Sequence, residues 1–384
     1  MTDARLFSSF EELPEEARAL FEAAGADCFF SSLPWFKTFA SHALDAGDRI
    51  RIYSVNSVTG GQKHQAFLAA LHRAADSGFW KPRKLSSLTS YYSSLFSPVW
   101  NDPRTRQAAE DLAKTIAKDS PRWDEIELKP LDVDSTAFAA LVQGMESAGF
   151  VVQTYFCFGN WYLKVNSRSY AQYVESLPSV LKNTLNRKRK KLEKSGRAKV
   201  EIITGGEGLE GAIEAYNKVY LASWKQPEPY PHFVPELIRT CAKLGALRLG
   251  LIYVDGEPAA AQFWIVKNGK ALIYKLAYDE RFADLSVGTV LTATLMQSAI
   301  DVDKVEEIDY LTGDDSYKKD WMSHRRERWG ILAMNPKTIR GALAIARHVG
   351  GRAVKRTLQS LVSSAPKPQK AIEPGERTST AQEC

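Results

Sequence analysis

Hydrophobic and polar positions alternate most clearly in the second half of the chain. Residues 247–254, 259–266 and 271–278 are three apolar runs, separated by the dipeptides Asp255-Gly256 and Asn268-Gly269. Both dipeptides favour type I′ turns, in which two consecutive residues have positive φ. The pattern therefore predicts three consecutive antiparallel strands joined by tight hairpins.

The rest of the chain has helical or strand periodicity in a repeated order. In the first half we expect helices over 10–24, 34–44, 105–118 and 135–148, and strands over 50–56, 65–73, 124–129 and 150–165. In the second half we expect further helices over 170–194, 209–224, 234–244, 288–300 and 316–322, and strands over 200–204, 306–311 and 329–334. The first two strands are joined through Gly60-Gly61, which predicts another hairpin. The repeated order predicts an α/β (α+β) protein of two similar domains, each a mixed, mostly antiparallel sheet flanked by helices.

Length and composition agree with two domains. A chain of 384 residues is too long for one ordinary core, and its 44% hydrophobic and 25% charged residues are typical of folded proteins. We expect the domains at 1–166 and 167–336, an amphipathic basic helix at 337–363, and a disordered tail at 364–384. The tail is rich in proline, serine, threonine and charge.

The cysteines and the N-terminal segment indicate the compartment. Cys28, Cys157, Cys241 and Cys384 are scattered and have no CxxC spacing, which argues against a disulfide framework or a zinc site. The first sixteen residues are acidic and lack the apolar core of a signal peptide, and no apolar run approaches the ~18 residues of a membrane span. We therefore expect a cytoplasmic protein that uses no metal.

The net charge of +6 is concentrated in one segment. Between Lys182 and Lys199 nine Lys and Arg residues face one acid, so this stretch carries +8 and the remainder 6 − 8 = −2. This distribution argues against a protein that coats nucleic acid in general. The stretch is either a solvated helix face or a phosphate platform for CoA, a nucleotide-linked sugar or tRNA. Arg187 and Lys191 are four residues apart and could bind one phosphate group.

Four motifs in the second half suggest a family. They are DGEPAAAQ at 255–262, YKLAYDE at 274–280, SVGTVL at 286–291, and the spaced residues of DYLTGDDSYKKDW at 309–321. Together they resemble the acetyltransferase domain of the CelD/BcsL-like proteins (a BioF2-like domain), a branch of the GNAT superfamily related to the FemAB peptidyltransferases. The resemblance covers about 165–335 and extends loosely to the first half. It implies a GNAT-like fold in each half and acyl transfer, usually from acyl-CoA and often in bacterial surface-polysaccharide pathways.

The resemblance also implies where the donor binds. In a GNAT fold the strand before the central helix splays from the next strand. The gap takes the pantetheine arm, and backbone N–H groups at the helix start hold the pyrophosphate. Here the matching positions are Ser286, which could cap the helix, Gly288, which allows close approach, and Thr289. The loop before them has fewer glycines and arginines than is usual in GNAT proteins, so an ordinary capped helix start is the alternative.

Three residues are candidates for catalysis. Tyr317 follows the post-helix strand, where many GNAT enzymes place a tyrosine acid; otherwise it packs beside Trp321. Asp309 is either a base, directly or through water, or half of a buried ion pair with Lys275 or Lys318, and we favour the ion pair. Lys275 lies in an otherwise apolar strand, so it needs a carboxylate or phosphate partner.

Further residues are candidates for binding the substrate. Tyr278 and Asp279 lie where a strand ends and could shape the acyl pocket, and Lys318 is either a substrate ligand or a solvated charge. Trp224, Tyr91 and Tyr92 are the kind of aromatic residues found in sugar-binding clefts, although most aromatic residues belong to cores.

Three functions remain open from the sequence. The first is an enzyme that transfers an acyl group, most simply acetyl, from acyl-CoA or acetyl-CoA to an amine or hydroxyl of a small molecule or glycan precursor. The second is a FemAB-like transferase that takes an amino acid from aminoacyl-tRNA, which the basic segment would bind. The third is a non-catalytic GNAT-like protein that binds a glycan or a partner protein.

Overall fold

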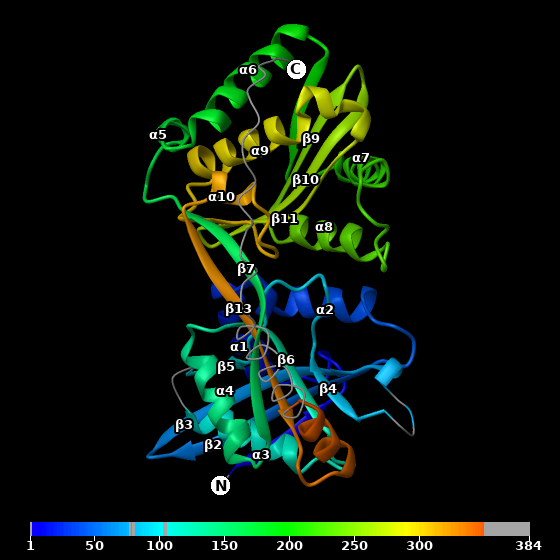
Figure 1. The fold of residues 1–384 in the computed structure, drawn as a ribbon, viewed down its shortest axis with the longest axis vertical. Coiled ribbons are helices and arrows are strands. Elements are labelled where there is room, and N and C mark those ends of the chain that lie inside the picture. The colour runs from blue at the N-terminus through cyan, green and yellow to red at the C-terminus, as the bar shows by residue number, and fades with distance from the viewer. Residues whose placement is uncertain (1, 77, 79–80, 103–105, 349–384) are drawn as a thin grey trace, which may run out of the picture.

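The structure, a computed structural model, describes residues 2–76, 78, 81–102 and 106–348. They form two lobes, one above the other in Figure 1. The first lobe contains β1 (Asp3–Phe7), α1 (Glu15–Asp27), η1 (Phe29–Ser31), α2 (Leu33–His42), β2 (Arg49–Thr59), β3 (Gln62–His72), η2 (Ala74–Asp76), β4 (Lys84–Ser87), β5 (Val99–Trp100), α3 (Arg106–Ala117), β6 (Glu125–Asp132) and α4 (Thr136–Ser147). The second contains α5 (Tyr170–Glu175), α6 (Ser179–Ser195), β8 (Ala198–Ile203), α7 (Leu209–Leu221), α8 (Phe233–Lys243), β9 (Leu247–Val254), β10 (Glu257–Lys267), β11 (Lys270–Tyr278), η3 (Glu280–Leu285), α9 (Val287–Gln297), η4 (Ser298–Val302), β12 (Glu307–Asp309) and α10 (Lys318–Trp321).

Two long strands, β7 (Val151–Lys164) and β13 (His324–Met334), make the two lobes into one continuous sheet. The strand order is β1-β2-β3-β4-β6-β13-β7-β12-β11-β10-β9-β8, with β5 paired to β3. Only the pairs β4/β6 and β11/β12 are parallel within the described residues. The mixed, mostly antiparallel architecture expected from the sequence is confirmed.

The hairpins are also confirmed. Asp255 and Gly256 have φ of 50° and 83°, and Asn268 and Gly269 have φ of 48° and 73°, as a type I′ turn requires. The turn at Gly60 and Gly61 has positive φ at both residues too. These turns fix the register of β2/β3 and of the β9–β11 meander.

Three expectations need correction. The helix expected over 170–194 is broken into α5 and α6, because Pro178 has no N–H to donate and disfavours helical backbone in the residue before it. The strands β1 and β4 were not expected, and the last strand begins at His324 rather than at residue 329. Because β13 pairs with both β6 and β7, the C-terminal strand lies among strands of the first lobe. The division at residue 166 stays a prediction.

The C-terminal helix is seen only in part. Residues 339–348 are helical, and the remainder of the expected helix and the tail lie outside the described residues. Within the described residues, no helix combines the length and the apolar character needed to cross a lipid bilayer.

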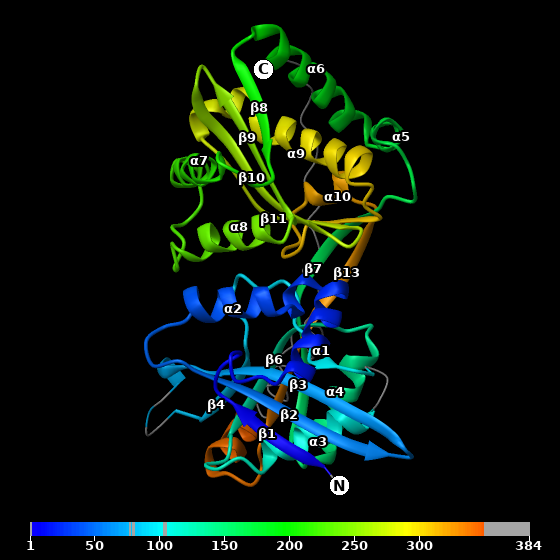
Figure 2. The ribbon, with the colours of Figure 1, turned by 180° about the vertical axis from the view of Figure 1, so that it is seen from behind.

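The two lobes share an apolar core at their boundary. Helix α2 of the first lobe packs on α8 of the second, as both views show (Figures 1 and 2). Trp35 and Phe39 lie edge-on to Phe233, with ring centroids 5.7 and 6.0 Å apart, and all three side chains are buried. Burying each such ring contributes about 1.5–3 kcal/mol, so the lobes are held in one arrangement. A cavity at this boundary is therefore preformed.

Candidate functional site

The strands β11 and β12 pair over only three residues. Residues 270–272 are in register with 307–309, and the pairing ends there. The next residue, Tyr310, donates its N–H to Trp161 O at 3.0 Å, and Gly313 bridges Asn160, so this segment follows β7 instead of β11. A gap therefore opens between the two parallel strands, as the family resemblance implies.

The gap contains a cavity of about 350 Å³, called here the β11/β12 cavity. Residues 273–276 form one side and residues 310–312 the other. The remaining lining residues come from loops of both lobes: Tyr91, Tyr92, Ser94, Trp224, Lys225, Asp315, Tyr317 and Lys318. Six residues predicted for the site from the sequence thus meet in one cavity: Lys275, Tyr317, Lys318, Tyr91, Tyr92 and Trp224.

A polar network forms one wall of this cavity. Lys275 Nζ lies 2.7 Å from Glu228 Oε1 and 2.6 Å from the hydroxyl of Tyr91. The hydroxyls of Tyr91 and Tyr92 donate to Glu228 Oε2 at 2.6 and 2.7 Å. Burial raises the pKa of Glu228, but the Lys275 ammonium and these donors outweigh it and leave the pKa below its usual value. Lys275 therefore has the carboxylate partner that its apolar strand requires.

Two polar side chains in the cavity have no such partners. The Tyr317 hydroxyl and the Lys225 ammonium make no hydrogen bond or ion pair among the described residues, and Lys225 lies beside the rings of Tyr220 and Trp224. Burial, with a smaller contribution from Asp315, raises the pKa of Tyr317 to about 12. Burial, followed by the charge of Lys275, lowers the pKa of Lys225 to about 8. At neutral pH the cavity thus holds a protonated phenol and an amine that is partly neutral.

The start of α9 adjoins this cavity through Tyr278, whose ring centroid lies 4.7 Å from that of Trp224. A Cβ placed on Gly288 would lie 3.1 Å from the Tyr278 ring, so the helix start packs directly on that ring. Ser286 occupies the N-cap position with φ of 54°, but its side chain makes no capping hydrogen bond, contrary to the expectation. Among the described residues, no side chain accepts a hydrogen bond from the first N–H groups of α9, up to Thr289. These groups also have no acceptor within the helix, as at any helix start.

Two predicted residues have structural partners. Asp279 is buried and accepts from the backbone N–H of Arg281 at 2.9 Å while pairing with its guanidinium at 2.6 Å. Lys318 is buried rather than solvated, and donates to Thr312 O at 2.6 Å while pairing with Asp315. Lys318 thus shapes the loop that forms one rim of the cavity.

The basic helix α6 packs against α9 through Leu185 and Leu192. Arg187 and Lys191 lie on its exposed face, apart from the cavity lining. Lys188, between them, donates to Asp284 O at 2.6 Å in the loop before α9. The helix thus places positive charge near the start of α9.

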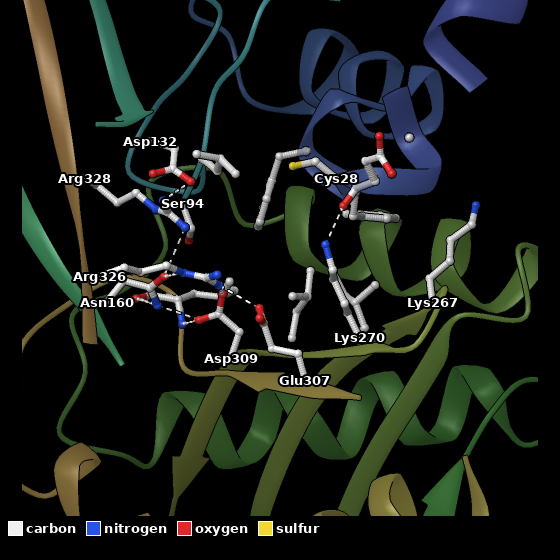
Figure 3. A pocket seen from close by; sticks show the side chains of 18 of the residues that line it. Cys28, Ser94, Asp132, Asn160, Lys267, Lys270, Glu307, Asp309, Arg326 and Arg328 are labelled. Atoms are coloured by element: carbon white, nitrogen blue, oxygen red, sulfur yellow. Dashed lines mark hydrogen bonds and ion pairs between the residues drawn. The ribbon is translucent and has the colours of Figure 1, made fainter. Parts of the chain in front are cut away.

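Asp309 lies in a second cavity, called here the interlobe pocket (Figure 3). Its carboxylate accepts from Asn160 Nδ2 at 2.5 Å, from Leu311 N at 2.6 Å and from Arg326 Nη2 at 2.5 Å. The ion-pair interpretation of Asp309 is thus favoured, but the partner is Arg326 and not Lys275 or Lys318. Asp309 does not line the cavity that contains Tyr317.

Sequence reasoning missed Lys225 and Glu228. Both lie in the loop between α7 and α8, where no periodicity or motif marks them. Their only signal is the charge within an otherwise uncharged loop (Gln226, Pro227, Pro229 and Tyr230). Among the described residues, no group of three or more His, Cys, Asp or Glu side chains could hold a metal ion.

Comparison with known proteins agrees with this geometry. Residues 179–319 match the model of the family described as "Acetyltransferase (GNAT) domain", and a comparison with curated proteins finds no match. The fold is similar to the crystal structure of FemX, with TM-score 0.57 and 12% identity over 85% of this chain and 96% of that one. It is also similar to a conserved protein of unknown function from Bacteroides thetaiotaomicron (TM-score 0.53, 11% identity, 86% and 100% covered).

A third similar structure is a tandem GNAT protein from the clavulanic acid biosynthesis pathway, with TM-score 0.50 and 11% identity over 88% of this chain and 100% of that one. At these identities the likeness concerns the fold alone. The family match runs from α6 to the first residues of α10, the part of the chain that contains β11 and β12. Residues 179–319 therefore match a GNAT acetyltransferase domain, of the kind found in the CelD/BcsL-like proteins, and the whole fold is similar to those of FemX and a tandem GNAT protein.

Proposed function

We propose that this chain transfers an acyl group, most simply acetyl, from acyl-CoA to an amine or hydroxyl acceptor. The observation that carries the proposal is the open gap between β11 and β12, with the uncapped start of α9 at its end. A cavity of about 350 Å³ has room for the thioester end and pantetheine arm of the donor rather than for the whole of CoA.

The residues present suit a phosphorylated donor. Free backbone N–H groups at the start of a long helix attract anions, because they lack intrahelical acceptors and the helix dipole adds positive charge. Gly288 has no side chain to cover this backbone, which packs beside the Tyr278 ring, and the basic helix α6 contacts the preceding loop through Lys188. Arg187 and Lys191 extend that positive surface. When bound, the donor supplies a carbonyl carbon activated as a thioester.

Two side chains would perform the proton transfers. Lys225, in its neutral form, takes the proton from the attacking amine or hydroxyl, and Tyr317 gives a proton to the departing sulfur. Both lack competing partners among the described residues, and at neutral pH Lys225 is partly neutral while Tyr317 still carries its proton. Lys275, held by Glu228 and the two tyrosines, positions the wall of the cavity and adds a fixed positive charge.

The acceptor would enter from the loop side of the cavity. Trp224 and Tyr91 are 49% and 60% exposed at its mouth, enough for a flat sugar or similar ring to stack on them. A surface-polysaccharide precursor is therefore a fitting acceptor. Cys28, Cys157 and Cys241 are free thiols, which suits the cytoplasm, where acyl-CoA is available.

A FemAB-like transfer from aminoacyl-tRNA is the second candidate, and the exposed basic face of α6 favours it. Calorimetric titration of the full chain with CoA and separately with tRNA distinguishes the two. We expect micromolar binding of CoA and none of tRNA. Binding of tRNA alone would replace the first candidate by the second, and binding of neither, with no acyl transfer, would favour a glycan-binding or protein-binding role.

A further inference from the structure

The interlobe pocket is a small cavity of about 160 Å³ between the end of α1 in the first lobe and the β10–β12 sheet in the second. Figure 3 shows Arg328 and Asp132 on one wall and Lys267 and Lys270 towards the opposite side. Lys270 Nζ is tied to Asp27 O at 3.0 Å, so both lobes hold this wall in place. None of the residues assigned to proton transfer above lines this pocket.

Arg328, on β13, has unused hydrogen-bond donors in the pocket. Its side chain is 3% exposed, yet its Nε and Nη1 groups make no hydrogen bond within the described residues. Nη1 lies 3.2 Å from Asp132 Oδ2 as an ion pair, and Nη2 donates weakly to Asn160 Oδ1 at 3.3 Å. Buried donors without acceptors are costly, so such a guanidinium calls for an oxygen ligand.

The neighbouring Arg326, in the same pocket, has the hydrogen-bond partners expected of an arginine with a structural role. It donates to Asn160 Oδ1 at 2.8 Å, to Glu307 Oε1 at 2.8 Å and to Asp309 Oδ2 at 2.5 Å. These Arg326 donors thus have close, fixed acceptors, whereas Arg328 has only the longer contacts to Asp132 and Asn160 and no partner at Nε. Arg328 is therefore the anion-binding group of the pocket.

The charges around the pocket favour a small monoanion that also carries a positive group. Four basic side chains line it (Lys267, Lys270, Arg326 and Arg328), and so do four acidic ones (Asp27, Asp132, Glu307 and Asp309). A phosphate dianion next to Asp132, Glu307 and Asp309 would be repelled, whereas a carboxylate can form a bidentate pair with a guanidinium. An ammonium group would be attracted by the acidic side chains.

We propose that the interlobe pocket binds the carboxylate of an amino-acid-like acceptor, with Arg328 as the ligand of that carboxylate. The proposal rests on the proposed acyl transfer, for which it defines the acceptor as an amine that also bears a carboxylate. Ser94 and Leu311 line both cavities, so the two cavities are adjacent, and an acceptor anchored at Arg328 would reach the β11/β12 cavity past these residues. Ser94 and Thr312, which share a hydrogen bond of 2.9 Å, form the boundary between the two.

Ligand-observed NMR on the full chain tests the proposal with acetate, glycine, L-alanine and glycylglycine, each beside its amide. The amide keeps the size and any amine but removes the negative charge. We expect the carboxylates to bind at least about tenfold more tightly than the amides, as the loss of one charged hydrogen bond predicts. Arg328→Gln should abolish this difference. Arg325→Gln is the control, since Arg325 lies on the same strand but pairs outside the pocket with Asp314 and Glu327.

Thermal unfolding separates ligand binding from structure. Both variants, Arg328→Gln and Arg328→Lys, remove the buried Nε donor that lacks an acceptor, but Arg328→Gln also removes the ion pair with Asp132, whereas Arg328→Lys keeps a positive charge beside it. If Arg328 serves a ligand, at least Arg328→Lys should therefore unfold close to the wild-type temperature. A clear loss of Tm in both would make Arg328 structural and overturn the proposal. Equal binding of acids and amides, or no binding of either, would overturn it too. CoA titration of the same samples reports independently on the acyl-transfer proposal.

Discussion

Each lobe contains a pair of parallel strands that a helix connects along the chain. The two pairs differ in what occupies the space where the strands stop pairing and diverge. In the first lobe, residues 84–86 of β4 pair with 125–127 of β6, and α3 connects the strands. In the second, residues 270–272 of β11 pair with 307–309 of β12, and α9 connects them. Each pair is in register over three residues, so the topology is repeated.

Hydroxyl side chains close the gap in the first lobe. Ser87 Oγ donates to Lys129 O at 2.7 Å and accepts from Lys129 N at 3.1 Å, and Thr89 Oγ1 lies 3.0 Å from the same carbonyl oxygen. In the second lobe, a cavity lined by Lys275 and Tyr317 occupies the corresponding place. The same strand–helix–strand unit is thus closed in the first lobe and forms the candidate site in the second. The side chains that follow the paired residues make this difference.

Replacing Tyr317 by phenylalanine should have the largest effect. Removing a general acid lowers kcat by about 10²–10⁴-fold, whereas binding of CoA should change little, because the ring is kept. Steady-state kinetics with acetyl-CoA and calorimetry with CoA measure the two quantities. Tyr253→Phe, on β9 away from the cavity, is the control and should retain full activity. If Tyr317→Phe retains full kcat as well, Tyr317 is not the acid.

Filling the second gap should make it resemble the first. Leu276 is half-buried in the lining of the β11/β12 cavity, so Leu276→Trp should place an indole in the space for the pantetheine arm. We expect CoA affinity to fall at least ~10²-fold, since each ~1.4 kcal/mol of lost contact is a factor of ten. Calorimetry measures the affinity, and circular dichroism checks that the protein remains folded.

The matched change in the first lobe is Ser87→Ala. It leaves the Lys129 N–H, which is only partly buried, without its acceptor, so stability should fall by about 0.5–1.5 kcal/mol in urea unfolding. Affinity for CoA should stay the same, because the first gap has no part in donor binding. Unchanged CoA binding by Leu276→Trp, or a loss of it by Ser87→Ala, would remove the functional distinction between the gaps.

Local patterns in the sequence predicted most of the second lobe. The hairpins at Asp255-Gly256 and Asn268-Gly269 depend on turn chemistry within a few residues, so they could be placed well. The position of the gap followed from the family resemblance, and Lys275 stood out because a charge in an apolar strand needs a partner.

The partners could not be predicted, because they come from distant parts of the chain. Glu228 reaches Lys275 from a loop 47 residues away, and Arg326 reaches Asp309 from β13, a strand that returns to pair with β6 and β7. Long-range pairing of this kind leaves no periodic signal in either segment. The family motifs placed the site in the second half of the chain, but no local pattern showed that Ser87 and Thr89 close the corresponding gap in the first.

The pKa of Lys225 predicts how activity depends on pH. Only the neutral amine accepts a proton, and burial holds its pKa at about 8. Below pH 8, kcat/KM should therefore fall about tenfold per pH unit and should level off above it. Among the described residues, Ser87 and Thr89 stand at the corresponding place in the first lobe, and neither is an amine. A pH–rate profile measures this fall in kcat/KM. Lys225→Met should abolish the fall below pH 8 together with most of the activity.

The lowered pKa of Lys225 also makes the stability of the fold depend on pH. Between pH 8 and the ordinary lysine pKa of about 10.4, the unfolded chain holds the proton of Lys225 and the folded chain does not. The contribution of Lys225 to stability therefore rises with pH in that window. Lys225→Met should flatten this rise in urea unfolding. If kcat/KM of Lys225→Met still falls below pH 8 as in the wild type, another residue is the base.

The smallest expected effect is that of a single methyl group at the start of α9. In Gly288→Ala the new Cβ lies 3.1 Å from the Tyr278 ring, so ring and helix must move by a few tenths of an ångström where the pyrophosphate is expected. We expect CoA affinity to fall about tenfold, or ~1.4 kcal/mol. Stability should change by less than about 1 kcal/mol, because the helix propensity of alanine offsets the crowding.

Gly211→Ala on α7 is the matched control, because its new Cβ meets nothing within 4 Å outside its own helix. It should raise stability by about 0.5–1 kcal/mol through helix propensity alone and leave CoA binding unchanged. The difference in CoA affinity between the two variants therefore reports the effect of the methyl group at the start of α9, separate from any effect of helix propensity. If Gly288→Ala binds CoA as tightly as Gly211→Ala, the start of α9 does not hold the donor, and the open gap loses the anion site that distinguishes it from the closed one.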